Sequence, residues 1–298
     1  MLLRPFRLRK PTSTAEANAG ASHDNKRNTG MKVRQPVFDF SSIRPHWAPV
    51  REFAQSYNAF STVPAHIEPF LVKVMMRVKD ALGDKHQALR DSIEIFNKQE
   101  VQHCKQHVAF NKMLYKSGYA GMQELEKPYK DDYTRFLATK SLRFNVAYCE
   151  GFEAMGSSAG QVFFEELDEY LEGADQAAVD LWKWHLAEEF EHREVCFQAY
   201  KALYGSGPFA YLYRLWGFVY AVKHIGTHTA KVSAYLIGVD RDGMTPEERE
   251  RSIERQKILK AKISKASRKR LLKVLSPFYN PGKMVPSPGM AALLERFG

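Results

Sequence analysis

The chain has 298 residues, of which 44% are hydrophobic and 12% aromatic, and its formal net charge is +10. This apolar content is enough for a sizeable core in one domain with tails. Only three cysteines are present, which excludes a disulfide scaffold, and their spacing matches no zinc module. We therefore expect Cys104, Cys149 and Cys196 to be small, buried packing residues in a reducing compartment.

Residues 1–40 are rich in Arg, Lys, Ser, Thr, Asn and Gly and contain few apolar positions, which predicts a disordered basic segment. Its first residues form no apolar stretch, and Pro5 and Pro11 interrupt any amphipathic targeting helix, so we expect no cleavable signal. Beyond residue 41 helical periodicity dominates and strand signals are absent. The predicted helices cover about 64–82, 86–116, 130–139, 141–172, 175–204, 207–237 and 245–275.

The first predicted helix offers one carboxylate as a candidate metal ligand. Glu68 is the only acidic residue between Glu52 and Asp80, so it is the carboxylate that this helix can contribute. His66 could compete with it, although a histidine near the start of a helix is more typical of a surface or capping residue. We therefore expect Glu68 to be the ligand.

The second predicted helix carries Glu100 and His103 as a Glu-x-x-His pair. Residues at i and i+3 project from one helix face, so both side chains can reach the same ion. His107 lies one turn beyond His103 and is expected to support the site. One such pair is weak evidence by itself, because charged helices often present these residue types to solvent.

The helix predicted at 141–172 offers two carboxylates on one face, Glu150 and Glu153. We expect one of them to bind metal and the other to support it. Tyr148 and Gly151 lie beside Glu150 and indicate a tight interior position where a backbone or ligand approaches closely. Glu150 is therefore the preferred ligand, with Glu153 and Tyr148 in supporting positions.

The helix predicted at 175–204 repeats the Glu-x-x-His spacing with Glu189 and His192. His185 lies four residues before Glu189, so these three side chains form one stripe over two turns, and Glu188 is expected beside it. The alternative for His185 is simple packing against the neighbouring tryptophans, with its ring nitrogens bonded to backbone or water. The repetition of the pattern on a separate helix strengthens the metal hypothesis.

Each lone-glutamate helix precedes a Glu-x-x-His helix, as expected for two similar antiparallel helix pairs. This order predicts an all-α fold, a ferritin-like four-helix bundle over residues 41–240 with additional C-terminal helices. The basic helix and tail of 241–298 are expected to pack on the bundle. Charged groups flanked by apolar residues need compensation in an interior, and a bound metal supplies it.

Residues from about 45 to 285 resemble the bacterial proteins catalogued as "predicted metal-dependent hydrolase". The resemblance rests on Gln99 to His107, on Glu150, and on Trp184 to His192. The order of the ligands is also similar to that of p-aminobenzoate N-oxygenase-type diiron enzymes, in which an additional histidine binds one iron. The resemblance implies seven metal ligands: Glu68, Glu100, His103, Glu150, His185, Glu189 and His192.

Carboxylates and imidazoles without a thiolate suit two Fe ions, with Mn or Zn as alternatives. The main hypothesis is a diiron oxygenase or oxidase that activates O2 on a small, apolar or carrier-bound organic substrate, with Glu100, Glu150 and Glu189 in catalytic positions. The alternatives are a dinuclear metal-dependent hydrolase of a phosphate or ester, and a non-catalytic metal-binding protein. Dinuclear hydrolases usually take several Asp ligands from loops, whereas the predicted ligand stripes contain no Asp.

The segment 249–273 contains eleven Lys or Arg against two Glu, with apolar residues between them. The plain interpretation is a solvated helix, and the partners it could accept are an anionic membrane surface or an acidic acyl carrier protein. Nucleic acid is not expected, because no reading helix or aromatic platform accompanies the basic residues. The apolar stretch 211–238 contains charges and fails as a membrane span. We expect a cytoplasmic protein, with peripheral attachment at the inner membrane face as an alternative, and a homodimer is compatible with the sequence.

Overall fold

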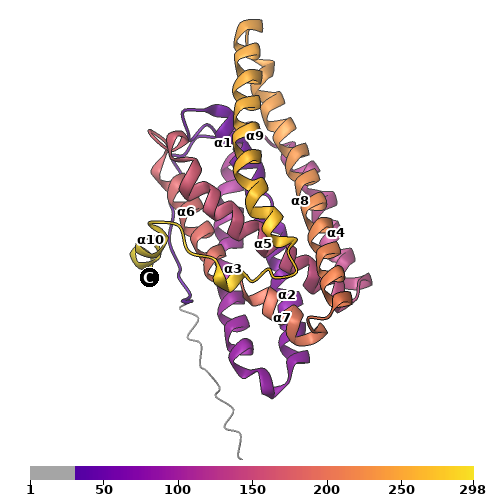
Figure 1. The fold of residues 1–298 in the computed structure, drawn as a ribbon. Coiled ribbons are helices and arrows are strands. Elements are labelled where there is room, and N and C mark those ends of the chain that lie inside the picture. Colours follow the sequence, from indigo (N-terminus) through magenta and orange to yellow (C-terminus); the bar gives the residue numbers. More distant parts are fainter. Residues whose placement is uncertain (1–30) are drawn as a thin grey trace, which may run out of the picture.

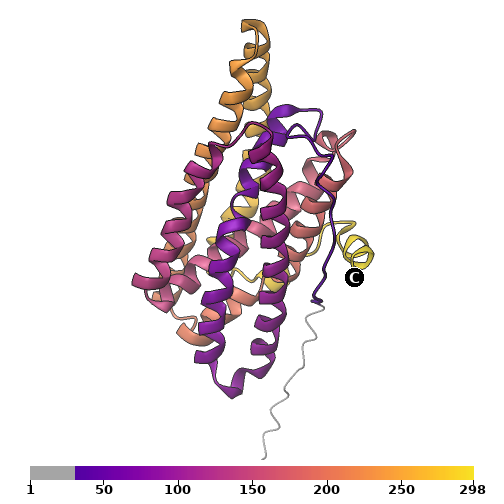
Figure 2. The same cartoon turned by 180° about the vertical axis from the view of Figure 1, so that it is seen from behind.

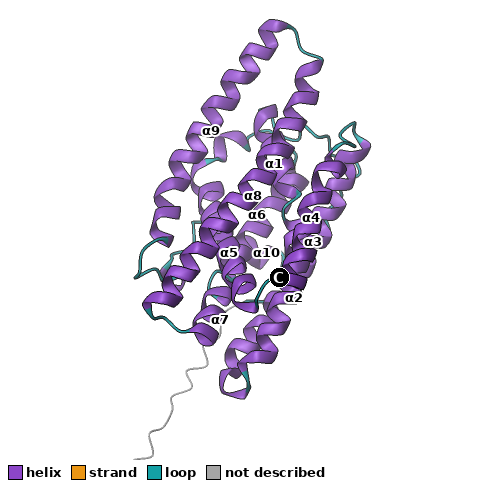
Figure 3. Ribbon diagram, turned by 90° about the vertical axis from the view of Figure 1, so that its right-hand side faces the viewer, coloured by secondary structure: helices purple, strands orange, loops and turns teal. Residues whose placement is uncertain are grey.

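The computed structural model describes residues 31–298, and these residues form helices, turns and loops without a strand (Figures 1 and 3). The α-helices are α1 (Arg51–Ser61), α2 (Pro64–Leu82), α3 (Gln87–Lys116), α4 (Met122–Thr139), α5 (Leu142–Glu166), α6 (Gln176–Glu191), α7 (Val195–Tyr204), α8 (Pro208–Asp242), α9 (Pro246–Val274) and α10 (Met290–Arg296). Short 3-10 turns lie at Asp84–His86, Asp168–Tyr170 and Pro281–Lys283. The all-α prediction is confirmed for the described residues, and the arrangement is consistent with a ferritin-like bundle.

Two antiparallel helix pairs form the centre of the molecule. α2 and α3 make one hairpin, which lies at the front in Figure 2. α5 and α6 make the other pair, and α5 also packs against α7, α8 and α9. Because α5 has neighbours on nearly every side, most of its residues are buried, and the inner faces of the two pairs enclose the polar cluster described below.

Local sequence fixes where the helices of the second pair begin. The Ser141 hydroxyl accepts a hydrogen bond from the Phe144 backbone N–H (3.2 Å) at the start of α5. The Asp175 carboxylate accepts one from the Ala177 N–H (3.0 Å) at the start of α6. Each cap satisfies a backbone donor that the first turn of a helix leaves unpaired. These caps therefore set the register of the site residues along α5 and α6.

Glycines allow α5 to approach its neighbours closely. A Cβ added at Gly151 would lie 2.9 Å from the Cα of Phe218 in α8. A Cβ added at Gly160 would lie 2.8 Å from the backbone oxygen of Leu186 in α6. Both separations are shorter than a side chain tolerates, so larger residues would push α8 or α6 away from α5.

The helices differ from the sequence-based expectation at four places. α1 and α10 are not predicted, and both are short, with 11 and 7 residues. The helix predicted at 175–204 is interrupted, because α6 ends with His192 as its C-cap residue and α7 begins three residues later. α4 begins at Met122, before the predicted start at 130.

Part of the predicted disordered segment, residues 1–30, lies outside the described residues. The remainder, 31–40, runs along the bundle beside α10 (Figure 1). Arg34 in this stretch is only 6% exposed, because its guanidinium bonds to carboxylates of α6 and to the backbone oxygen of Leu294. The structure therefore departs from the expectation of disorder over 31–40, where Arg34 and the apolar residues Met31, Phe38 and Phe40 hold the stretch against the bundle.

The two longest helices at the C-terminal side, α8 and α9, extend beyond the rest of the bundle (Figure 1). α9 packs on α1 and α5, and α10 packs on α6. None of the described helices combines the length and the apolar character that crossing a membrane requires.

Candidate metal centre

Seven acidic and imidazole side chains gather in the interior where α2, α3, α5 and α6 face one another. They are Glu68 of α2, Glu100 and His103 of α3, Glu153 of α5, His185 and Glu189 of α6, and His192 at the end of α6. None of them is more than 2% exposed. The i, i+3 and i, i+4 spacings place the members from one helix on its inward face.

Six of these residues form two overlapping groups that are each able to hold a metal ion. One group consists of Glu68, His103, His185 and Glu189, and the other consists of Glu100, His103, Glu189 and His192. Within each group the ligand atoms lie within 4.8 Å of one another. Because His103 and Glu189 belong to both groups, the two positions adjoin.

Most of the atoms that could coordinate a metal make no hydrogen bond with a described residue. The atoms without a hydrogen bond are both oxygens of Glu68 and of Glu100, Oε1 of Glu153, Oε2 of Glu189, Nδ1 of His103 and Nε2 of His192. Leaving one buried polar group unpaired costs about 1–3 kcal/mol, so such a concentration requires compensation by cations. Their nitrogen–oxygen separations run from 3.1 to 3.9 Å, which suits ligands that each lie about 2.0–2.2 Å from a shared ion. The residues therefore fit a metal site.

A chain of polar contacts orients His103. Its Nε2–H donates to Oε2 of Glu188 (2.9 Å), which leaves Nδ1 facing the carboxylates of the cluster. Arg34 donates to Oε1 of the same Glu188 (2.9 Å) and also binds Glu191 of α6 through two nitrogens (2.7 and 3.1 Å). Such outer contacts fix the ring of a ligating histidine and raise its affinity for metal. Glu188 thus lies between His103 and Arg34.

A second chain orients His185. The Ser61 hydroxyl donates to Oδ1 of Asn111 (2.7 Å), so its oxygen accepts from Nδ1–H of His107 (2.8 Å). Nε2 of His107 then accepts from Nδ1–H of His185 (2.6 Å). Nε2 of His185 is left with a lone pair directed at Glu189 (3.1 Å), as a metal ligand requires.

Glu153 orients the ring of His192 in a similar way. Its Oε2 accepts from Nδ1–H of His192 (2.9 Å), so that Nε2 of the ring faces Oε1 of Glu100 (3.5 Å). Each of the three imidazoles therefore presents one nitrogen to the candidate ions and donates from the other to a side chain that belongs to neither metal-binding group.

The electrostatics of the cluster favour positive charge. Burial raises the pKa of Glu68 and of Glu153 well above the ordinary value, and neighbouring carboxylates raise both further. Burial alone would lower the pKa of His103, but the carboxylates around it outweigh that effect and raise its pKa to about 9. They raise the pKa of His192 to about 10 in the same way. Protons thus neutralise the cluster when no metal does so, and metal ions compete with them.

Gly156 of α5 makes room for one of the shared ligands. A Cβ at this position would lie 2.1 Å from Oε2 of Glu189. The carboxylate therefore occupies the space that any side chain at residue 156 would fill, and the glycine is part of how the bundle holds this ligand.

The structure places two of the predicted residues differently. Glu150 does not join either group, because its Oε1 accepts from the guanidinium of Arg214 (2.9 Å), which also bonds to the backbone oxygen of Val274 (2.8 Å). The carboxylate that α5 turns toward the cluster is Glu153. Tyr148 also lies away from the supporting contacts, since its hydroxyl bonds to Tyr133 (3.0 Å) and to the His224 ring (2.8 Å).

His66, the competitor of Glu68, pairs with Glu126 (2.7 Å) outside the cluster. Sequence reasoning missed Arg34, Ser61 and Asn111. The signal for Asn111 is its place one turn beyond His107 on α3, whereas Arg34 and Ser61 lie on segments that carry no ligand and give no signal in the sequence.

The helical fold and the buried cluster of carboxylates and imidazoles together assign the chain to the class of metal-binding helical-bundle proteins. Residues 32–284 match the family described as "Predicted metal-dependent hydrolase". This match covers most of the chain, so the chain belongs to that family, and the resemblance noted in the sequence is confirmed. Searches of curated proteins and of solved structures gave no match.

Proposed function

We propose that the cluster holds two metal ions, iron by preference, and that the protein is a non-haem oxidoreductase that activates O2 on a small, apolar organic substrate. The observation that carries the proposal is the pair of adjoining groups that share His103 and Glu189. All their donors are carboxylates and imidazoles, which suit iron or manganese better than a closed structural zinc site. A bound iron pair would supply the electrons that reduce O2.

The chain's own residues would bind the ions, exclude water and hold protons. Glu68, Glu100 and Glu189 offer the carboxylates. Hydrogen bonds from His103 to Glu188 and from His185 to His107 keep these two imidazoles in place. The burial of every ligand supports O2 as a reactant, because a small apolar molecule reaches an enclosed site more easily than a charged phosphate ester.

Metal-dependent hydrolysis is the second candidate, and the description of the family favours it. Two adjoining ions could activate a water molecule and polarise an ester or phosphate oxygen.

Iron content and oxygen reactivity test the proposal together. Protein expressed with added iron should purify with about two iron ions per chain, and the reduced, anaerobic protein should consume O2 and develop a transient visible absorption. Glu189→Ala should lose both properties, whereas Glu126→Gln, a buried carboxylate outside the cluster, should keep them. One zinc ion per chain that survives Glu68→Ala would contradict a dinuclear site.

The same preparation separates the two reaction classes. Anaerobic turnover of p-nitrophenyl phosphate or a p-nitrophenyl ester, together with no reaction of the reduced protein with O2, would establish the hydrolase and overturn the oxidoreductase. A hydrolase activity that Glu189→Ala leaves unchanged would point to a contaminant.

A further inference from the structure

α8 presents an apolar stripe to solvent over its first three turns. Phe209, Leu212, Trp216 and Val219 are 85%, 58%, 48% and 55% exposed, and their spacing puts them on one side of the helix. The opposite side of α8 is buried against α5. Large exposed apolar side chains that follow one another along a helix are typical of an interaction surface.

The surroundings of the stripe are basic. Between Pro208 and Val239 α8 contains no Asp or Glu. At the start of α5 the guanidinium of Arg143 lies over the ring of Tyr213 (4.3 Å) and donates to the backbone oxygen of Phe209 (3.4 Å). Farther along α8 the stripe leads into a shallow hollow lined by small and apolar residues and by two lysines, Lys223 and Lys231.

α9 adds a second basic surface. From Arg255 to Lys273 it contains nine Lys or Arg and no carboxylate. Lys265, Arg268 and Lys269 are exposed, and none forms an ion pair with a described residue. Exposed apolar side chains accompany them, with Ile258 at 56% and Leu272 at 57%.

The C-terminal end of α9 lies against the first turns of α8. The Tyr211 hydroxyl donates to the backbone oxygen of Leu275 (2.6 Å), and Arg214 donates to that of Val274 (2.8 Å). Phe278, which follows, is 91% exposed. The C-terminal end of α9 and the first turns of α8, which carry the apolar stripe, are therefore neighbours.

We propose that the outward faces of α8 and α9 form a docking surface for an anionic lipid bilayer. Exposed aromatic and aliphatic side chains would enter the boundary between headgroups and acyl chains, and the lysines and arginines would bind acidic headgroups. An exposed tryptophan among them is typical of a membrane interface. Since no described helix could cross a membrane, the contact would be peripheral.

The tryptophans give the proposal a specific readout. Trp47, Trp182 and Trp184 are at most 3% exposed, whereas Trp216 lies within the stripe. Mixing the protein with vesicles that contain phosphatidylglycerol should therefore shift the emission of Trp216 to the blue and protect it from acrylamide, and Trp216→Phe should abolish the shift. Vesicles of phosphatidylcholine alone should give little change, and added salt should reverse the binding.

Two sets of variants locate the surface. Lys265→Glu, Arg268→Glu and Lys269→Glu combined should weaken binding to the anionic vesicles by roughly a hundredfold. Phe209→Ser should reduce it as well. These positions are exposed, so circular dichroism should show an unchanged melting temperature.

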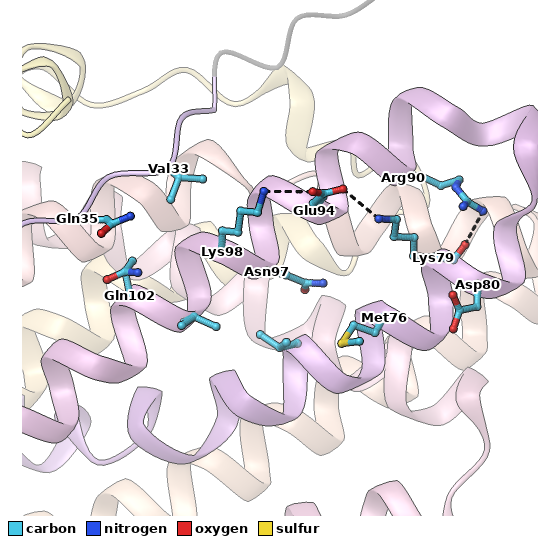
Figure 4. Close-up of a pocket in the computed structure, with 12 residues that line it drawn as sticks. Val33, Gln35, Met76, Lys79, Asp80, Arg90, Glu94, Asn97, Lys98 and Gln102 are labelled. Carbon is cyan, nitrogen blue, oxygen red and sulfur yellow. Dashed lines mark hydrogen bonds and ion pairs between the residues drawn. The ribbon is translucent and has the colours of Figure 1, made fainter.

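A matched control lies on the other side of the bundle, where the N-terminal segment, α2 and α3 form a pocket with an exposed methionine, Met76 (Figure 4). There Glu94 accepts from both Lys79 (3.0 Å) and Lys98 (3.1 Å), so these two lysines are paired with a carboxylate. Met76→Ser should leave vesicle binding unchanged.

Several results would overturn the proposal. They are equal binding to neutral vesicles, binding that survives the charge reversals, and loss of binding in Met76→Ser to the same extent as in Phe209→Ser. A dimer that buries Trp216, or capture of an acidic protein or nucleic acid by α9 without any vesicle binding, would also overturn it.

Discussion

At the scale of single residues, the metal cluster depends on groups that do not bind metal. Glu188, Glu153 and His107 each hold one nitrogen of a candidate ligand, and Gly156 leaves the space that Glu189 occupies. A site of this kind is sensitive to small changes in the residues that surround its ligands. A ligand displaced by one ångström no longer matches the geometry of the ion.

Gly156→Ala tests this dependence. Alanine is about 1 kcal/mol more favourable than glycine inside a helix, but its methyl group would overlap Oε2 of Glu189. We expect the variant to remain helical and to lose most of its bound metal, as measured by elemental analysis and circular dichroism.

Gly238→Ala is the matched control, because a Cβ at that position of α8 has nothing within 4 Å. It should retain its metal and gain about 0.5–1 kcal/mol in the free energy of unfolding. Full metal content in Gly156→Ala would show that the Glu189 carboxylate can shift without loss of metal and would contradict the role given to Gly156.

At the scale of helices, periodicity alone predicted most of the bundle and much of the cluster. α3 and α6 each place their Glu and His on one inward face, so the spacing was sufficient to bring them together. Glu150 and Glu153 lie on the same face of α5, and sequence spacing cannot choose between them. The choice depends on Arg214 of α8, whose guanidinium binds Glu150 and which is distant along the chain.

α1 shows the other limit of prediction from sequence. Its buried face carries Gln55 and Asn58, which satisfy each other and their neighbours: Asn58 donates to Gln55 (3.0 Å) and accepts from Trp47 (2.9 Å). A polar network of this kind is as buried as an apolar core, although its residue types are those that usually lie at the surface. The partners of such groups become known only from the tertiary structure.

The same network predicts a dependence of stability on pH. Burial by itself would raise the pKa of Asp240 at the end of α8, but hydrogen bonds from His46, Tyr119 and Gln55 outweigh it and hold the pKa below its ordinary value. A carboxyl whose pKa is lowered on folding stabilises the protein above its unfolded pKa, and that contribution is lost as the pH falls through the folded pKa.

Acid titration of the free energy of unfolding should therefore show a loss below about pH 4 that Asp240→Asn reduces. The variant should itself cost roughly 1–3 kcal/mol at neutral pH, because the donors lose a charged acceptor. Denaturant unfolding at several pH values measures both quantities. Parallel acid profiles for the variant and the wild type would contradict this role of Asp240.

At the scale of the whole molecule, the two candidate ion positions join α2, α3 and α6. A ligand that binds only the folded state stabilises it, by about 4 kcal/mol when present at a thousandfold excess over its dissociation constant. Removal of metal with a chelator should therefore lower the melting temperature, since uncompensated carboxylates remain in the interior.

The comparison of two variants shows whether the change in melting temperature on metal removal comes from the cluster. Glu68→Gln should reduce the difference in melting temperature between metal-loaded and chelated protein. Glu126→Gln, whose carboxylate pairs with His66 and Tyr115 instead, should leave that difference as large as in the wild type. A chelator effect of equal size in both variants would place the stabilising metal elsewhere.

Arg34 links the first part of the described chain to its last helix. Its guanidinium reaches Glu188, which supports His103, and the backbone oxygen of Leu294 in α10. The ribosome makes residue 34 early and residue 294 late. All six residues of the two candidate groups are therefore synthesised before Arg34 can bond to Leu294. Nascent chains that stop short of Met290 would therefore carry every one of these side chains but hold His103 less firmly, and metal loading would improve once α10 has emerged and docked.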